Sequence, residues 1–235
     1  MTTPVRNGLL ITGTDTEVGK TVVTSALTAY WLQHFPKASL GLMKVVQSGL
    51  GDFEQYQRLF NLDQDPETIA PQRFSAPLAP PLAAAQEGKA VDLEPVWQAL
   101  SQLLANRQFV LVEALGGLGS PVTEEWTVAD LAAAWRLPIV LVVPVKLGAI
   151  AQAVANIALA RQNRLFIRGI VLNSTQPLSP EERANWAPVE LIERMTQVPV
   201  LGYLPFLSDP ENLSDLAAAA SALSLEAVWN LVRSS

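Results

Sequence analysis

Short, continuously apolar runs recur along the chain, and segments with helical spacing separate most of them. The runs do not alternate between apolar and polar residues, which is typical of strands buried on both faces of a parallel sheet. Strands that alternate with helices predict an α/β fold, a doubly wound and mostly parallel sheet with helices on both faces. We expect strands over residues 8–12, 40–46, 109–113, 139–145, 169–173 and 200–204, and helices over residues 20–33, 53–60, 93–106, 127–135, 149–162, 180–196 and 212–232.

The composition favours one large core. Hydrophobic residues make up 49% of the 235 residues and charged residues only 16%, which is too little charge for a disordered chain. Residues 66–95 contain several prolines but remain apolar, so we expect an irregular excursion over one face of the sheet rather than a linker. The sequence therefore predicts a single domain over residues 1–235.

Charge and rare residues exclude several classes of function. The net charge of -6 argues against binding nucleic acid or an anionic membrane. The chain has no cysteine and a single histidine, so a disulfide framework, a thiolate nucleophile and a multi-histidine metal site are poor hypotheses. We expect His34 at the surface, near the end of a helix. Neither a signal peptide nor an apolar run long enough to span a membrane is present, so the simplest location is the cytoplasm.

A glycine-rich loop joins the first predicted strand to the first predicted helix. Residues 13–21 read GTDTEVGKT. A strand, a glycine loop, Gly-Lys-Thr and a helix form the context of a P-loop, whose backbone N–H groups bind the phosphates of a nucleotide. Lys20 would contact the β- and γ-phosphates, and the Thr21 hydroxyl would bind Mg²⁺. Five residues separate Gly13 from Gly19 where four are usual, so the loop is a variant with an intact Gly-Lys-Thr end.

Acidic residues provide candidates for the carboxylates that a P-loop metal requires. Glu113 ends an apolar strand pattern, at the edge where open α/β sheets bind ligands, unless it merely caps the strand at the surface. Asp52 follows the second strand and begins a helical pattern, where metal binding and N-capping explain it equally well. Asp15 and Glu17 lie inside the loop, where they would order it or meet an amine of the substrate.

Two further lysines stand near strand ends. Lys44 lies within the apolar run of the second strand, where a charge is costly without a partner. That partner would be a γ-phosphate or a carboxylated substrate, unless the side chain extends to solvent. Lys146 follows the fourth strand, where a site role and an exposed turn are equally open.

The sequence resembles the dethiobiotin synthetases over nearly its whole length. The most specific match is TGTDTEVGKT at residues 12–21, which includes the extra loop residue of that family. Shorter matches gain weight from their order and spacing. They are KVVQSG at 44–49, AQEG at 85–88, VE at 112–113 with GG at 116–117, TVAD at 127–130, VKLG at 145–148, and Asn173.

The resemblance implies a cytoplasmic, homodimeric P-loop enzyme, an ATP- and Mg²⁺-dependent cyclo-ligase. It would convert 7,8-diaminononanoate and CO₂, or bicarbonate, into dethiobiotin, ADP and phosphate. One amine captures CO₂ as a carbamate, the carbamate attacks the γ-phosphate to give a carbamoyl phosphate, and the second amine closes the ring. Several anionic groups then share one pocket, so cations must surround them.

The resemblance also assigns roles to residues. Lys20 and Lys44 would be catalytic, stabilising the transferring phosphoryl group and the carbamate. Thr16 and Ser48 would contact the diamine or its carbamate. The expected metal ligands are Thr21, Asp52 and Glu113. The expected nucleotide contacts are Glu17, Val18, Gly19, Lys20, Thr21, Val22, Asp52, Glu113, Ala114, Leu115, Gly116 and Asn173, with Leu204, Pro205 and Phe206 beside the adenine.

Three departures from the family pattern concern the site. Val45 stands where the family usually has proline, which bears on how Lys44 is aimed. Ala114 and Leu115 replace a common Gly-Ala pair after the strand. Residues 151–152 are Ala-Gln in place of a frequent Asn-His pair, in the helix that the carboxylate tail of the substrate would reach.

Two other classes share parts of this pattern. P-loop amidoligases of corrinoid synthesis usually carry a glutaminase domain with a catalytic cysteine, and this chain has neither the cysteine nor the length. ParA-like nucleotide switches, which are not metabolic enzymes, typically have a second lysine early in the loop, where this chain has Asp15 and Glu17. Hydrolysis of ATP that requires diamine and bicarbonate indicates the synthetase, whereas hydrolysis stimulated by DNA or lipid indicates the switch.

Overall fold

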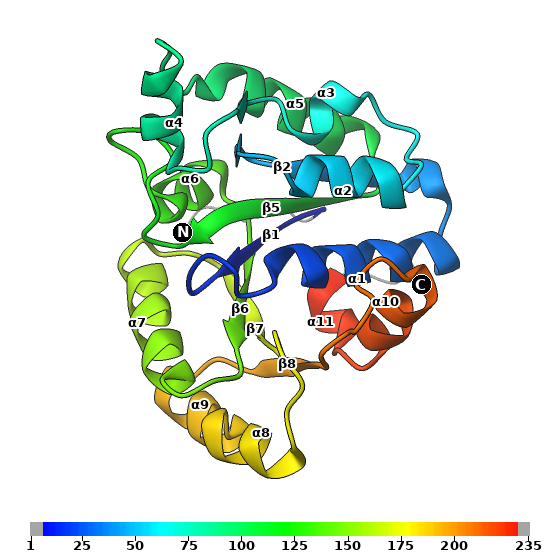
Figure 1. Ribbon diagram of the computed structural model, residues 1–235, viewed down its shortest axis with the longest axis vertical. Helices are drawn as coiled ribbons and strands as arrows, with labels where there is room; N and C mark the ends of the chain where they lie inside the picture. Colours follow the sequence, from blue (N-terminus) through cyan, green and yellow to red (C-terminus); the bar gives the residue numbers. More distant parts are fainter. Residues whose placement is uncertain (1–6, 230–235) are drawn as a thin grey trace.

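The computed structural model describes residues 7–229 and is built around a six-stranded sheet (Figure 1). The strand order is β2-β5-β1-β6-β7-β8, and each neighbouring pair is parallel. The predicted fold class, an α/β doubly wound parallel sheet, is confirmed. The strands are β1 (Gly8–Gly13), β2 (Leu40–Lys44), β5 (Phe109–Gly117), β6 (Ile139–Pro144), β7 (Ile167–Asn173) and β8 (Val200–Leu204).

Helices cover both faces of the sheet, which explains why the strands are continuously apolar. Successive side chains of a strand point to opposite faces. In β1, Leu9 and Ile11 pack in the apolar cluster of one face, and Leu10 packs in that of the other. The first face carries α1 (Lys20–His34), α10 (Leu213–Ser221) and α11 (Leu225–Trp229); the second carries α5 (Leu93–Asn106), α6 (Val128–Trp135), α7 (Ala149–Gln162) and α9 (Val189–Thr196).

The proline-rich segment is more regular than expected. Prolines occupy the first turn of two short helices, because a fixed φ and a missing N–H are tolerated there. This segment lies beyond the edge strand β2 and extends the fold on that side, as Figure 1 shows. A short 3₁₀ helix, η1 (Lys37–Ser39), precedes β2. Between β2 and α5 the chain forms β3 (Gln47–Ser48), α2 (Asp52–Leu59), α3 (Pro66–Ile69), β4 (Arg73–Phe74) and α4 (Pro80–Gln86), and β3 pairs with β4 in a small parallel sheet.

Several predicted boundaries were wrong. The strand expected at residues 40–46 ends at Lys44, whereas β5 continues beyond Glu113 to Gly117. The single helix expected at residues 180–196 is two helices, α8 (Pro180–Trp186) and α9, because Pro188 between them cannot continue a helix. The helix expected at residues 212–232 is α10 and α11, and its last three residues lie outside the described part of the chain.

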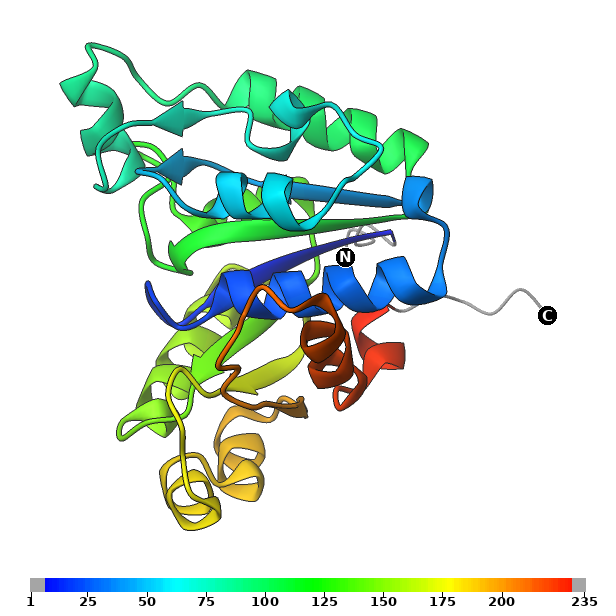
Figure 2. The same ribbon diagram turned by 45° about the vertical axis from the view of Figure 1, so that its right-hand side comes forward.

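Parallel strands bring their carboxyl ends to one edge of the sheet. Figure 2 shows the arrowheads of β2 and β5 at the same edge as the loop between β1 and α1. The register places Lys44 beside Glu113, and Gly13 beside Gly117. The predicted phosphate loop and the predicted charged residues therefore meet at this edge. Within residues 7–229, no helix has the length and apolar character needed to cross a bilayer.

Candidate functional site

The loop between β1 and α1 requires glycine at its junction with the helix. Gly19 has φ 88°, a left-handed conformation, directly before the first residue of α1. A side chain at this position would also meet the Asn173 amide nitrogen at 2.0 Å. Within the loop, the Asp15 carboxylate accepts a hydrogen bond from the Thr16 backbone N–H at 2.7 Å. Asp15 thus orders the loop, while Glu17 is exposed and lines the cavity described below.

Lys20 begins α1, and its side chain folds back along the loop. Its Nζ donates to the Asp15 carbonyl oxygen at 2.8 Å, and the residue is only 6% exposed. Burial lowers the pKa of Lys20 to about 8, although the nearby Glu113 carboxylate opposes this shift. An anion placed against the loop would favour the charged ammonium, as a nucleotide phosphate does.

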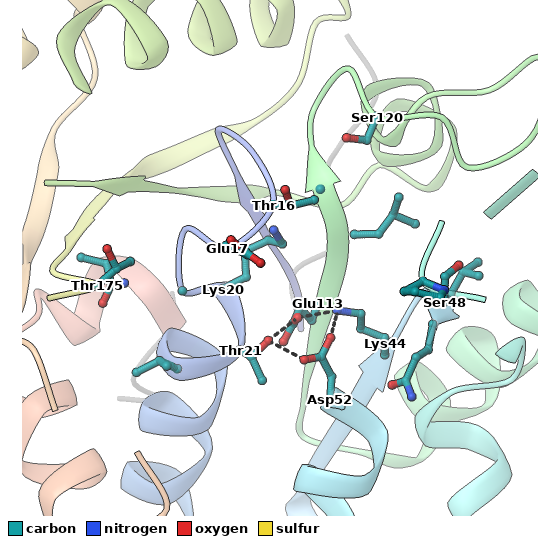
Figure 3. A pocket seen from close by; sticks show the side chains of 18 of the residues that line it. Thr16, Glu17, Lys20, Thr21, Lys44, Ser48, Asp52, Glu113, Ser120 and Thr175 are labelled. Atoms are coloured by element: carbon teal, nitrogen blue, oxygen red, sulfur yellow. Dashed lines mark hydrogen bonds and ion pairs between the residues drawn. The ribbon is translucent and has the colours of Figure 1, made fainter. Parts of the chain in front are cut away.

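Side chains from four elements converge beside the loop, as Figure 3 shows. The Thr21 hydroxyl of α1 lies 2.9 Å from Asp52 Oδ1 of α2 and 2.9 Å from Glu113 Oε1 of β5. From β2, Lys44 Nζ donates to Glu113 Oε1 at 2.6 Å and also to Asp52 Oδ2. Glu113 is fully buried and Lys44 nearly so. The interpretations of Glu113 as a surface cap and of Lys44 as a solvent-reaching lysine are therefore wrong.

Opposite charges keep Lys44 and Asp52 ionised in this cluster. Burial alone would lower the pKa of Lys44, but the negative charges of Glu113 and Asp52 outweigh it and raise the pKa. Burial alone would raise the pKa of Asp52, but the Lys44 charge and hydrogen bonds from Lys44 and Thr21 outweigh it and lower the pKa. Lys44 is therefore an ammonium and Asp52 a carboxylate at neutral pH.

Asp52 belongs to the cluster and not to a helix cap. It is the first residue of α2, after Gly51 at the N-cap position. Its carboxylate bonds to Thr21 and Lys44, which come from two other elements. The N-capping interpretation of Asp52 is therefore wrong.

The turn that carries Asp52 is fixed by Gln47, which belongs to the KVVQSG match but to which the sequence assigned no role. Gln47 Oε1 accepts from the Phe53 N–H at 2.7 Å, and its Nε2 donates to the Glu54 carboxylate at 2.9 Å. The same carboxylate accepts from the Gly51 N–H at 2.8 Å. These bonds hold the start of α2 against β3, so Asp52 faces Lys44.

The oxygen cluster, formed by Thr21, Asp52 and Glu113, has the donor set for Mg²⁺. Carboxylates and hydroxyls are the hard oxygen ligands that this ion takes, usually one or two carboxylates together with phosphate oxygens. The Thr21 hydroxyl oxygen lies 2.9 Å from an oxygen of each carboxylate, so the three side chains could each give one oxygen to the same ion. Residues 7–229 contain no group of three His, Cys, Asp or Glu residues suited to a metal. The residues present therefore fit an ion that arrives with phosphate.

The loop and the cluster open into one cavity of about 1010 Å³. This volume is at the upper end of the range for small-molecule sites, which leaves room for a nucleotide and a second ligand. Figure 3 shows Ser48 on one side of the cluster and Thr175 on the other. The predicted site residues that line the cavity are Thr16, Glu17, Gly19, Lys20, Thr21, Val22, Lys44, Ser48, Asp52, Glu113, Leu115, Gly116, Asn173 and Phe206.

Other predicted nucleotide contacts do not line the cavity. The side chains of Val18, Ala114 and Leu204 are buried in the core, and Pro205 is exposed beside Phe206. In β5, Ala114 faces away from the cavity because its neighbour Glu113 faces toward it. Val18, Ala114 and Leu204 can reach a ligand only through backbone groups, and the roles of all four residues stay predictions.

The cavity also has lining residues that the sequence did not indicate. Ser174 and Thr175 follow β7 directly, and the rule that ligands bind at carboxyl strand ends would have pointed to them. Residues 77–80 and Ser120 come from the proline-rich segment and from the turn after β5, where no sequence signal marks a ligand. Leu50, at the rim, is 91% exposed.

The departures from the family pattern have structural counterparts. The Val45 backbone N–H donates to the Glu113 carbonyl oxygen at 3.0 Å, a bond that proline could not make. Val45 therefore ties the end of β2 to β5, next to the contact between Lys44 and Glu113. Near the start of α7, the Gln152 side chain lies 3.4 Å from the Thr14 hydroxyl, at the limit of a hydrogen bond.

His34 and Lys146 lie outside the cavity. His34 is exposed at the end of α1 and stacks on Tyr30 with ring centroids 4.1 Å apart, as expected for a helix-end residue. Lys146 is exposed in the turn after β6 and is not among the residues that line the cavity. Of the two interpretations of Lys146, the exposed turn agrees with the structure.

The parallel sheet, the glycine loop and the adjoining oxygen cluster define a P-loop nucleotide-binding protein. Solved structures of this fold include the cell division ATPase MinD of Pyrococcus furiosus, with a TM-score of 0.58, 16% identity, and coverage of 96% of this chain and 100% of that one. The ParA family ATPase of Chlorobium tepidum TLS has a TM-score of 0.55, 14% identity, and coverage of 95% and 98%. At these identities the likeness concerns the fold alone.

The sequence matches the family AAA_26, described as an AAA domain, over residues 7–214. The ATP-dependent dethiobiotin synthetase BioD of Gloeothece citriformis (strain PCC 7424) is 59% identical over 93% of this chain and 96% of the relative. The protein of the same name from Bacillus subtilis (strain 168) is 32% identical over 96% and 98%. The chain belongs to the dethiobiotin synthetase family.

Proposed function

We propose that this protein is an ATP-dependent ligase that closes the ureido ring of dethiobiotin in biotin biosynthesis. The substrates are 7,8-diaminononanoate, CO₂ or bicarbonate, and ATP, and the products are dethiobiotin, ADP and phosphate. The supporting observation is that Lys20, Lys44 and the oxygen cluster line one cavity. A triphosphate and a carboxylated amine can therefore be held face to face among compensating charges.

The first step in this proposal is the capture of CO₂ by one amine of the substrate. The amine lone pair attacks the carbon of CO₂, a C=O electron pair moves to oxygen, and the nitrogen gives its proton to water, which leaves a carbamate anion. We assign that anion to Lys44, and the assignment is supported by an ammonium that is nearly buried and lines the cavity. The Ser48 hydroxyl is buried, lines the cavity and has no hydrogen-bond partner within residues 7–229, which supports its assignment to the substrate. Thr16, which also lines the cavity, is the second proposed contact.

The second step transfers the γ-phosphoryl group to a carbamate oxygen and gives a carbamoyl phosphate. Lys20 and the loop N–H groups offset the charge of the phosphates, and Thr21, Asp52 and Glu113 are the residues that would hold Mg²⁺. When bound, the ion supplies Lewis-acid stabilisation of charge on the phosphate oxygens. The second amine then attacks the carbamoyl carbon, and phosphate leaves with the bridging oxygen.

The adenine is assigned to the side of the cavity formed by Asn173 and Phe206. Asn173 donates through Nδ2 to the Val18 carbonyl at 2.9 Å, and its buried Oδ1 has no partner in the described part of the chain. An amide oxygen in this state suits an amino group such as that of adenine, because a buried acceptor without a donor is costly.

An oxygen-label experiment tests the order of these steps. The carbamate pathway transfers an oxygen of CO₂ to the released phosphate, because the carbamate oxygen becomes the bridging oxygen. With ¹⁸O-labelled bicarbonate, we therefore expect ¹⁸O in the inorganic phosphate, detected by mass spectrometry within a single turnover. Phosphate that carries oxygen only from ATP and water would contradict the carbamoyl phosphate intermediate.

A further inference from the structure

Tyr56 is a fully buried tyrosine whose hydroxyl contacts the oxygen cluster. It donates to Glu113 Oε2, while Oε1 of the same carboxylate receives Lys44 at 2.6 Å and Thr21 at 2.9 Å. The two oxygens of Glu113 thus have separate partners. This division fixes the rotation of the carboxylate, which a single partner would leave free.

Tyr56 and Asp52 lie one turn apart on the same helix. Residues four positions apart in a helix share a face, so α2 directs a carboxylate and a phenol toward the same cluster. Asp52 reaches Thr21 and Lys44, and Tyr56 reaches Glu113. The docking of α2 therefore sets the geometry of both carboxylates at once.

We propose that Tyr56 is a positioning residue that keeps Glu113 a one-oxygen ligand and thereby favours Mg²⁺ over larger cations. With Oε2 engaged by the phenol, Oε1 is the oxygen of Glu113 that contacts Thr21. Mg²⁺ takes single oxygens in a near-octahedral shell, whereas the larger Ca²⁺ readily takes both oxygens of one carboxylate. The inference rests on the proposed Mg²⁺–nucleotide site and is independent of the diamine.

A purely structural role would be to satisfy a buried carboxylate oxygen. Such a role and a positioning role both predict that loss of the hydroxyl lowers stability. Only the positioning role predicts a change in metal preference, because it concerns which oxygens of Glu113 reach the ion. The metal preference is therefore the quantity that separates the two roles.

The test compares Tyr56→Phe with the wild-type protein and with Tyr30→Phe. Tyr30 supplies the control because it loses the same hydroxyl from α1, where its ring stacks on His34 outside the cavity. Calorimetric titrations measure Mg²⁺ and Ca²⁺ binding with a non-hydrolysable ATP analogue present. We expect Tyr56→Phe to weaken Mg²⁺ binding roughly tenfold, the lower end of the range for lost outer partners of metal ligands, with Ca²⁺ binding weakened far less. Tyr30→Phe should bind both ions as the wild type does.

A second measurement covers a loss of stability in the variant. Mg²⁺ or Ca²⁺ is added to the analogue-bound protein, and the rise in melting temperature is measured for each ion. The rise in the variant is compared with the rise in the wild type, so a lower melting temperature before the addition does not affect the comparison. If Tyr56→Phe prefers Mg²⁺ over Ca²⁺ as strongly as the wild-type protein does, the inference is overturned, whatever the stability of the variant. Because no diamine is present, failure here is distinct from failure of the proposed reaction, which product formation reports.

Discussion

Lys44 is the residue on which the charge balance of the site depends. Its ammonium bonds to both Asp52 and Glu113, and the cavity that it lines also contains Lys20. In the proposed reaction the same ammonium faces the carbamate. One side chain therefore links the stability of the folded site to the stabilisation of developing charge.

The substitution Lys44→Ala should affect both properties. We expect turnover to fall by a factor of roughly 10²–10³ or more, as for the loss of a preorganised charge donor. We also expect a loss of about 3 kcal/mol in the free energy of unfolding, because the buried Glu113 carboxylate loses its countercharge. Steady-state kinetics and urea denaturation measure the two effects, with the exposed Lys37→Ala as the control. Near-wild-type turnover would remove Lys44 from the mechanism.

The substitution Thr21→Ala tests the Mg²⁺ contact that we propose for the loop. The backbone N–H groups remain, so we expect nucleotide binding without metal to be nearly unchanged. The gain in nucleotide affinity on adding Mg²⁺ should fall by roughly tenfold or more, because one oxygen of the donor set is lost. Thr21→Ser, which keeps the hydroxyl, should retain most of that gain. Equal Mg²⁺ titrations for the alanine variant and the wild type would show that Thr21 is not a metal ligand.

At the scale of residues, the sequence was informative where chemistry follows from local spacing. The roles of Lys20 and Thr21 could be predicted because they follow the glycine loop and begin the helix after it. Lys44 could be predicted because a charge in an apolar strand is costly without a partner. The role of Tyr56 could not be predicted, nor could that of Gln47 within the KVVQSG match. Their hydrogen-bond partners belong to other helices and strands. A contact between separate elements produces no regular spacing of residues in the sequence, so no pattern predicts it.

At the scale of elements, the junction between the loop and α1 is the most constrained feature. Gly19 combines a left-handed φ with contact against Asn173, whose side chain is itself bonded to the loop through the Val18 carbonyl. Gly148, at the start of α7, has almost the same φ, 90°. A β-carbon added to Gly148 would have open space around it, with no atom of a more distant described residue within 4 Å. A side chain at Gly148 would therefore cause conformational strain alone, whereas a side chain at Gly19 would cause both strain and a steric collision.

Alanine substitutions at these two glycines test that distinction. Gly148→Ala should cost about 1–2 kcal/mol, the penalty for a left-handed conformation with a β-carbon. Gly19→Ala should cost roughly 1–3 kcal/mol more, because the new carbon displaces the Asn173 amide, and it should abolish nucleotide binding. Chemical denaturation and analogue binding provide the measurements. Equal losses of stability for the two variants would argue against the collision.

The elements themselves were largely predictable, and the errors have physical causes. Apolar runs located every strand of the large sheet, because burial on both faces excludes polar residues. The prolines of residues 66–95 suggested irregular chain although they start α3 and α4, and Pro188 divides a segment that helical spacing alone had joined. Proline is compatible with both a helix start and a break, and the outcome depends on tertiary contacts.

At the scale of the whole molecule, the parallel sheet explains why residues distant in sequence share one cavity. The loops after β1, β2, β5, β7 and β8 all open at the same edge, because the strands run in one direction. Fold class followed from the alternation of strands and helices. The sequence alone could not show how far the excursion after β2 extends the cavity wall, since that depends on packing between short elements.

Self-association is a further prediction at this scale, drawn from the family resemblance. We expect a homodimer, so sedimentation equilibrium should give about twice the chain mass of 25.4 kDa. The tail of the substrate is expected to reach the start of α7, near the partner subunit. Because the bound substrate would lie near both subunits, we expect the dimer to stay intact when nucleotide and diamine bind. A mass of 25.4 kDa at all concentrations would contradict this expectation.

Formation of the ring product tests the central claim most directly. Purified protein is incubated with ATP, Mg²⁺, ¹³C-bicarbonate and 7,8-diaminononanoate, and the products are identified by mass spectrometry. The account predicts dethiobiotin that carries the ¹³C label, with ADP and phosphate formed in equal amounts. Hydrolysis of ATP at the same rate without the diamine, and no labelled ring product, would contradict it.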